Sequence, residues 1–111
     1  MTLKRVDEQY RGLTYPWGRL DHPDETPFEV APGVWWLRFT MPGPLNHINL
    51  WLLEDGDGWT IVDTCLNLET AKAHWEALFD GFMGGKPVKR VICTHMHPDH
   101  IGLAGWLCER F

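Results

Sequence analysis

The chain has 111 residues and a formal net charge of −5, with 44% hydrophobic and 23% charged residues. That length allows one domain at most, and the acidic balance argues against a nucleic-acid partner, because phosphate contacts need clustered Lys and Arg. No apolar run reaches the length of a membrane span, and the opening MTLKRVDEQY lacks the apolar stretch of a signal peptide. Together with three widely spaced cysteines that form no C-x-x-C pair, these features predict a cytoplasmic protein without a membrane partner.

Residues 1–32 are expected to form an irregular arm. Prolines interrupt any hydrophobic period in this segment, and polar residues surround them in the stretch LDHPDETP. From Gly33 onward the sequence consists of apolar runs separated by short turns, so we place one domain over 33–111. The first run, VWWLRF (34–39), is rich in β-branched and aromatic residues and predicts a strand, which the loop MPGP (41–44) ends.

Two further strands are predicted as a hairpin. The runs LNHINLWLLE (45–54) and WTIVD (59–63) are joined by DGDG, in which glycine supplies the positive φ that a tight turn needs. After them, Asn67 is a candidate helix cap that precedes apolar residues at helical spacing. These residues, which predict one buried stripe, are Ala71, Trp75, Leu78, Phe79 and Phe82.

The run VKRVIC (88–93) predicts a fourth strand, and IGLAGWLCERF (101–111) starts another helix. Strand, helix and strand form a crossover unit, so 59–63 and 88–93 are predicted to be parallel neighbours in a sheet that the hairpin extends. The expected fold class is therefore α/β, with a mixed β-sheet and flanking helices. The last helical pattern continues to Phe111 with no glycine or proline to end it, which predicts a chain cut inside a longer domain.

The stretch CTHMHPDHIG carries most of the chemistry, because it gathers His95, His97, Asp99 and His100 around Pro98. In an extended segment residues two apart point the same way, so His95 and His97 can present two imidazoles to one point. Pro98 keeps His97 out of the helical region and forces a corner, after which Asp99 and His100 point in a second direction. This spacing suits two neighbouring cations, one for each pair.

Imidazole nitrogen together with carboxylate oxygen suits zinc best, with iron or manganese as alternatives. Two metal ions roughly 3.5–4 Å apart can deprotonate a shared water and polarise a carbonyl or phosphoryl oxygen. Asp99 would lie near that water and relay its proton, which makes it the predicted catalytic residue. By chance the pattern His-x-His-x-Asp-His arises roughly once in a thousand chains of this composition, so we prefer the metal site to coincidence.

At these residues the sequence resembles the metallo-β-lactamase superfamily, whose HxHxDH signature is matched here by HMHPDH. The resemblance extends over 33–111, since TIVDTC resembles the family strand that ends in Asp-Thr-Gly, with Cys65 in place of the glycine. It implies an αββα sandwich of which this chain covers only the first half, with two zinc ions per complete domain. The other family ligands lie later in the sequence than position 111.

The resemblance also implies a role for each residue of the motif. His95 and His97 would hold the first metal ion, and Asp99 and His100 the second. Asp63 would support the metal loop from beneath without being a ligand, although a plain strand-end or turn carboxylate is the alternative.

A candidate substrate loop spans 40–46, where the family has a substrate-flanking loop between its early strands. Met41, Pro42 and Leu45 are therefore candidate substrate contacts, with ordinary loop packing as the alternative. His47 and His74 match no family ligand, and neither does His22.

The resemblance implies a metal-dependent hydrolase with a small-molecule substrate, such as a thioester, a lactone or another small ester. A phosphodiesterase or nuclease of the same superfamily is one alternative. A catalytically incompetent half-domain or an interaction fragment is another, because this chain lacks the later ligands. A third alternative is a homo-oligomer, in which two chains complete the sandwich together.

Overall fold

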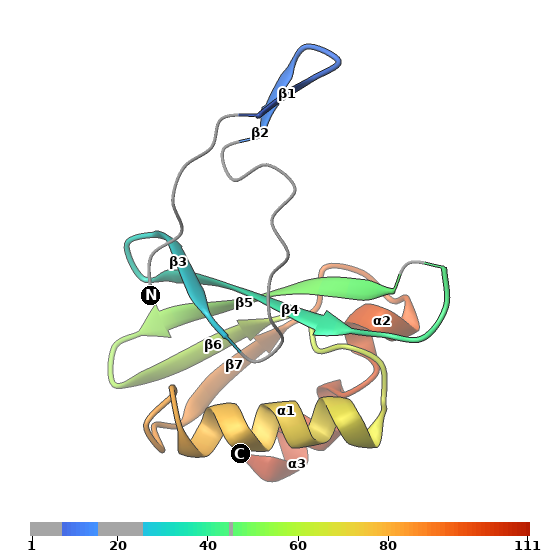
Figure 1. Ribbon diagram of the computed structural model, residues 1–111. Coiled ribbons are helices and arrows are strands. Elements are labelled where there is room, and N and C mark those ends of the chain that lie inside the picture. Colours follow the sequence, from blue (N-terminus) through green and yellow to red (C-terminus); the bar gives the residue numbers. More distant parts are fainter. Residues whose placement is uncertain (1–7, 16–25, 45) are drawn as a thin grey trace.

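The computed structural model describes residues 8–15, 26–44 and 46–111 and shows a mixed sheet with helices α1 and α3 on one side of it (Figure 1). In spatial order the strands of the main sheet are β3 (Phe28–Ala31), β4 (Val34–Thr40), β5 (His47–Asp55), β6 (Gly58–Val62) and β7 (Val88–Ile92). The helices are α1 (Glu69–Asp80), α2 (Pro98–Ile101) and α3 (Ala104–Arg110). A separate hairpin pairs β1 (Glu8–Tyr10) with β2 (Leu13–Tyr15).

The antiparallel pair of β4 and β5 builds one wall of the core. Leu37 lies opposite Leu50 and Phe39 lies opposite Ile48, and all four side chains are buried. Successive residues of a strand point to opposite faces, so the residues between them face the other side of the sheet. Alternate residues of β4 and β5 thus form the apolar face of the sheet on which helix α1 packs.

The predicted crossover is confirmed. β6 and β7 are parallel neighbours joined through α1, while β5 and β6 form the antiparallel hairpin that closes where Asp55 pairs with Gly58. Gly56 has a φ of 61° in that hairpin turn, as the DGDG stretch predicted. Parallel pairing brings the carboxyl ends of β6 and β7 to the same edge of the sheet.

The expectation that residues 1–32 are irregular is wrong for part of this segment. Besides the hairpin of β1 and β2, the short strand β3 pairs with the start of β4, where Phe28 lies opposite Trp36. Gly33, with a φ of 74°, makes the turn between them. The prolines limit strand length here, but they do not prevent the apolar Phe28 from being buried beside the sheet.

Helix α1 differs from its prediction at both ends. Leu68, not Asn67, is the N-cap, because the Leu68 carbonyl accepts the first helical hydrogen bond from the Lys72 N–H. Phe82 lies beyond the last helical turn and is 39% exposed, with its ring 4.8 Å from that of Trp35. The remainder of the predicted stripe is buried, and it consists of Ala71, Trp75, Leu78 and Phe79.

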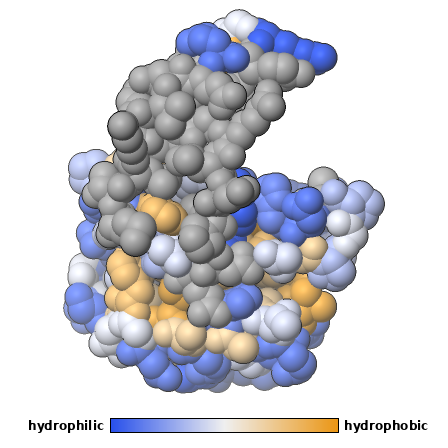
Figure 2. Space-filling view, in the orientation of Figure 1, coloured by the Kyte–Doolittle hydropathy of each residue, from blue (hydrophilic) through white to orange (hydrophobic). Residues whose placement is uncertain are grey.

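The core lies between the sheet and the helices. In the space-filling view, apolar residues show in the lower half of the molecule above a hydrophilic lower rim (Figure 2). Helix α1 therefore turns its apolar stripe to the sheet and its polar residues to solvent. No helix within the described residues is long and apolar enough to cross a membrane.

The last helical pattern is divided into α2 and α3, and Gly102 lies at the division. A Cβ built on Gly102 would lie 2.6 Å from the Pro98 carbonyl oxygen and 2.8 Å from both the Asn67 nitrogen and the Cys65 carbonyl oxygen. All three neighbours are backbone atoms, which cannot move aside as a flexible side chain would. Gly102 is thus the point of closest approach between the metal-motif helix and the segment that follows β6.

We expect Gly102→Ala to lower the free energy of unfolding by about 1–3 kcal/mol, the usual cost of forcing extra volume into a packed site. Gly105→Ala is the matched control, because its Cβ would meet nothing within 4 Å on helix α3. The control should stabilise the protein by about 0.5–1 kcal/mol, since alanine restricts the unfolded chain and favours helix. Urea unfolding of both variants checks this, and equal effects of the two substitutions would contradict it.

Candidate metal centre

The residues after β6 and β7 meet at one edge of the sheet. Asp63 follows β6 directly, and Thr94 follows β7 by two residues. Asp63 and Cys65 have φ values of 64° and 82°, so the chain turns sharply after β6 through two left-handed residues. Glycine adopts this conformation without steric cost, whereas a residue with a side chain does not. This explains why the family pattern has glycine at the position that Cys65 occupies here.

Asp63 is the buried anchor of the motif. Its Oδ1 accepts the Thr94 backbone N–H at 2.8 Å, and its Oδ2 accepts the Thr94 hydroxyl and the His100 Nδ1–H, each at 2.8 Å. Burial alone would raise the pKa of the Asp63 carboxyl, but the hydrogen bonds from Thr94 and His100 outweigh it and hold the pKa below its usual value. The carboxylate is therefore ionised and acts as an acceptor for the metal loop.

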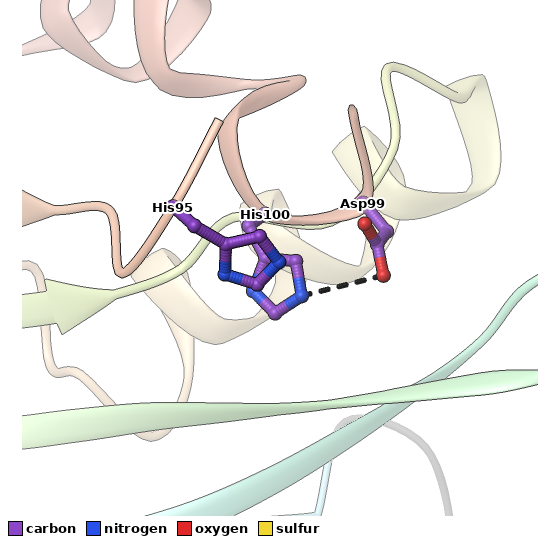
Figure 3. Close-up of side chains that lie close together, drawn as sticks. All are labelled: His95, Asp99 and His100. Carbon is purple, nitrogen blue, oxygen red and sulfur yellow. Dashed lines mark ion pairs between the residues drawn. The ribbon is translucent and has the colours of Figure 1, made fainter. Parts of the chain in front are cut away.

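His100 is oriented by this carboxylate. Because its Nδ1 donates to Asp63, its Nε2 is the ring nitrogen left to bind a proton or a metal ion. That nitrogen faces Asp99 Oδ2 at 3.3 Å, as the dashed line in Figure 3 shows. Two acceptor atoms at this distance repel each other unless a proton or a metal ion lies between them. The pair is thus arranged to share a cation.

His95 completes a set of three donors. Its ring centroid lies 3.7 Å from that of His100, and its Nδ1 is 3.1 Å from the Thr94 hydroxyl oxygen. One ligand atom each from His95, Asp99 and His100 can be chosen so that all three lie within 4.8 Å of one another (Figure 3). Two imidazoles and a carboxylate are a donor set that zinc accepts, so the residues fit a metal ion.

His97 is not part of this group of three. Its ring centroid lies 4.8 Å from that of His95 at a nearly perpendicular angle, and its side chain is exposed. The structure thus gathers His95 with Asp99 and His100, whereas the sequence predicted a pair of His95 with His97 and a pair of Asp99 with His100. The assignment of these four residues to two metal ions stays a prediction.

A groove of about 400 Å³ opens beside the motif. Its apolar wall includes Met41 and Pro42 from the loop between β4 and β5, and His97 and Asp99 line it from the motif. Leu45, the third residue predicted for this loop, lies outside the described residues. The groove places the candidate substrate loop next to the candidate metal ligands.

Sequence reasoning missed several residues of this region. Pro44 and Leu66 line the groove, and Thr94 connects Asp63 to the imidazoles of His95 and His100. Thr94 stands beside the first histidine of the motif, and Pro44 belongs to the loop already singled out. Their position next to these residues in the sequence could have indicated them, but the sequence does not show where their side chains point.

Comparison with protein families matches residues 43–111 to the metallo-beta-lactamase superfamily. Among curated proteins, a linear primary-alkylsulfatase from a Pseudomonas species is 39% identical over 75 residues, which are 68% of this chain and 10% of that protein. A probable metallo-hydrolase, YybB, from Bacillus subtilis is 34% identical over 84 residues, which are 75% of this chain and 36% of that protein. The chain therefore spans only a minor part of the curated relatives it matches.

Among solved structures, a beta-lactamase domain protein from Burkholderia ambifaria is 54% identical to this chain, with a TM-score of 0.78. The match covers 86% of this chain and 31% of that one. The mixed sheet and its helices therefore have the same arrangement as the corresponding part of that protein. The motif of three histidines and an aspartate falls within the residues that the family comparison covers.

Proposed function

Because the chain belongs to the metallo-β-lactamase superfamily, we propose that it supplies the first half of the active site of a metal-dependent hydrolase. The observation that carries the proposal is the cluster of His95, Asp99 and His100, in which the buried Asp63 holds His100 and Asp99 lines an apolar groove. Zinc is the proposed metal, with two ions per complete domain and iron or manganese as alternatives.

The two aspartates of the site have different proposed roles. Asp63 holds His100 so that Nε2 faces the cation site, and Asp99 provides a carboxylate at the same point. When bound, zinc would supply the positive charge that lowers the pKa of a water molecule and polarises an ester carbonyl. Asp99 would then accept a proton from the attacking water, since a carboxylate can act as a base where an amide cannot.

The proposed substrate is a small ester, such as a thioester or a lactone, with an apolar part. Met41, Pro42, Pro44 and Leu66 provide the apolar surface of the groove, and Asp99 lies at its polar side. An apolar wall with a few polar groups is typical of small-molecule sites. The net charge of −5 supports a small-molecule partner over a nucleic acid.

A sulfate ester is a second candidate substrate. The supporting observation is the 39% identity with the linear primary-alkylsulfatase over 75 residues. An alkyl sulfate also combines an apolar chain with a polar ester group, which suits the same groove. Parallel assays with an alkyl sulfate and a thioester of the same chain length separate the two candidates.

We also propose that this segment is catalytically incompetent by itself. In the described residues, three donors lie together, whereas a two-metal site needs more ligands than three. The missing ligands would come from a longer chain or from a second copy in a homo-oligomer. Hydrolysis by a protein that contains this chain together with the remaining ligands, and none by the 111 residues alone, is the expected result.

Metal uptake tests the site directly. We expect His95→Ala to weaken zinc binding at least about tenfold, measured by competition with a chelator, because an imidazole donor is lost. His47→Ala is the control, since this histidine lies on β5 outside the cluster and bonds the side chain of Asn46. Equal zinc affinity of the wild-type chain and His95→Ala would contradict the proposed ligand set.

A further inference from the structure

Thr64, which no part of the proposed chemistry uses, lies fully buried between the metal motif and the core. Its hydroxyl donates to the His100 carbonyl oxygen at 2.8 Å and accepts the Leu103 N–H at 3.0 Å. Its backbone N–H donates to the same His100 carbonyl at 2.9 Å. Thr64 therefore forms hydrogen bonds with the main chain of the motif on both sides of Gly102.

These bonds replace bonds that a continuous helix would make. In an α-helix the Leu103 N–H would donate to the Asp99 carbonyl, four residues earlier. Here it donates to Thr64, and Leu103 has φ −105° and ψ 8°, outside the helical region. A side chain inserted into the helical hydrogen-bond ladder is a known cause of helix interruption. The Thr64 hydroxyl thus separates α2 from α3.

Thr64 is itself fixed from the opposite side. The Trp75 indole N–H, from helix α1, donates to the Thr64 carbonyl oxygen at 2.9 Å. Asp63, the preceding residue, holds the His100 ring through Nδ1. Two adjacent residues after β6 therefore control His100, Asp63 through the imidazole and Thr64 through the backbone.

We propose that Thr64 is a positioning residue of the metal site, whose hydroxyl divides the motif helix and thereby directs the His100 imidazole to Asp63 and Asp99. The proposal rests on the proposed metal function. Without the hydroxyl, the Leu103 N–H needs another acceptor, and the Asp99 carbonyl is the one that helical geometry offers. The same change would remove the hydroxyl bond to the His100 carbonyl, which holds the main chain from which the imidazole reaches Asp63.

The test compares three variants of the whole 111-residue chain. Thr64→Val removes the hydroxyl but keeps the shape of the side chain, and Thr64→Ser restores the hydroxyl. Thr60→Val is the matched control, because Thr60 is a buried threonine on β6, the strand that precedes Thr64, and its hydroxyl donates to Asp55 at 2.8 Å, away from the motif. If the valine variant does not fold, Thr64→Ala removes the hydroxyl without placing a methyl group against the Leu103 N–H.

Two measurements are made on each variant. In the metal-free protein, NMR detects the His100 Nδ1–H that is bonded to Asp63, and we expect its signal to be lost in Thr64→Val and kept in Thr64→Ser and Thr60→Val. Zinc affinity, measured by chelator competition, should fall about 10- to 100-fold in Thr64→Val, as for other residues that orient metal ligands. The serine variant and the Thr60 control should bind zinc as the wild type does.

The outcomes separate this proposal from the one on which it rests. If the wild-type 111 residues take up no zinc, the proposal that they bind a metal ion by themselves fails, while the NMR comparison still decides whether Thr64 positions His100. A retained Nδ1–H signal in Thr64→Val overturns the positioning role. So does unchanged zinc affinity in that variant, or an equal loss of affinity in Thr60→Val, which would show a general effect of destabilisation.

Discussion

Replacing Asp99 by asparagine is expected to slow ester hydrolysis by about 10²- to 10⁴-fold in an active protein that contains this chain, the usual contribution of a positioned general base. Asparagine has the same shape as aspartate, so the groove that Asp99 lines should keep its form. The amide, however, cannot accept a proton from water. It also brings an uncharged group to within 3.3 Å of the His100 Nε2, where a carboxylate now faces the cation site.

The measurement is the hydrolysis rate of a thioester at saturating substrate, with zinc content determined on the same sample. Asp57→Asn is the matched control, since Asp57 is exposed on the hairpin between β5 and β6 and bonds Lys89 at 3.1 Å. The control should hydrolyse the thioester at the wild-type rate. Full activity of Asp99→Asn would show that this carboxylate is needed neither as a ligand nor as a base.

Replacing Trp75 by alanine is expected to lower the free energy of unfolding by about 3–5 kcal/mol, the usual cost of truncating a buried aromatic side chain. Trp75 is fully buried, and its ring lies 5.2 Å from Phe39 on β4 and 6.0 Å from Phe79. The change also removes the N–H that bonds the Thr64 carbonyl. Such a loss is a large fraction of the total stability of a small domain, about 5–15 kcal/mol.

Urea unfolding measures the effect of the Trp75 substitutions. We expect the dependence of the unfolding free energy on urea concentration to stay unchanged. Trp75→Phe keeps an aromatic ring but leaves the Thr64 carbonyl without its donor, so its cost should be about 1–3 kcal/mol. Phe82→Ala removes an aromatic side chain that is 39% exposed and should cost less than Trp75→Ala. If the alanine variants at 75 and 82 are equally stable, the core does not depend on the Trp75 contacts as described.

Most of the secondary structure was predicted from the hydrophobic period, and each departure from it has a physical cause. The crossover of β6, α1 and β7 was predicted from apolar runs and glycine turns, and parallel pairing confirms it. The strand β3 was missed because its four residues lie next to prolines and carry too short a pattern. The division of the last helix was also missed, since the Thr64 hydroxyl that causes it lies 39 residues away in the sequence.

For the candidate site, the motif predicted the donor residues, and their assignment to metal ions stays a prediction. His95, Asp99 and His100 form the group of three, and the His97 ring lies beside that of His95, with 4.8 Å between the centroids. Spacing of two in an extended segment predicted His95 and His97 as a pair. Residues 94–97 are a bent loop and not a strand, so the rule of alternating sides is not the reason that these two rings lie near each other.

The sequence by itself determined the kinds of atoms available to a metal ion, the order of the elements from β4 to β7, and the family. The tertiary structure decided which of those atoms face one another. Asp63 reaches Thr94 across 31 residues and His100 across 37, because parallel pairing of β6 and β7 brings their ends together. Sequence spacing sets only the local direction of a side chain, whereas contacts between distant segments depend on how the sheet and the helices pack.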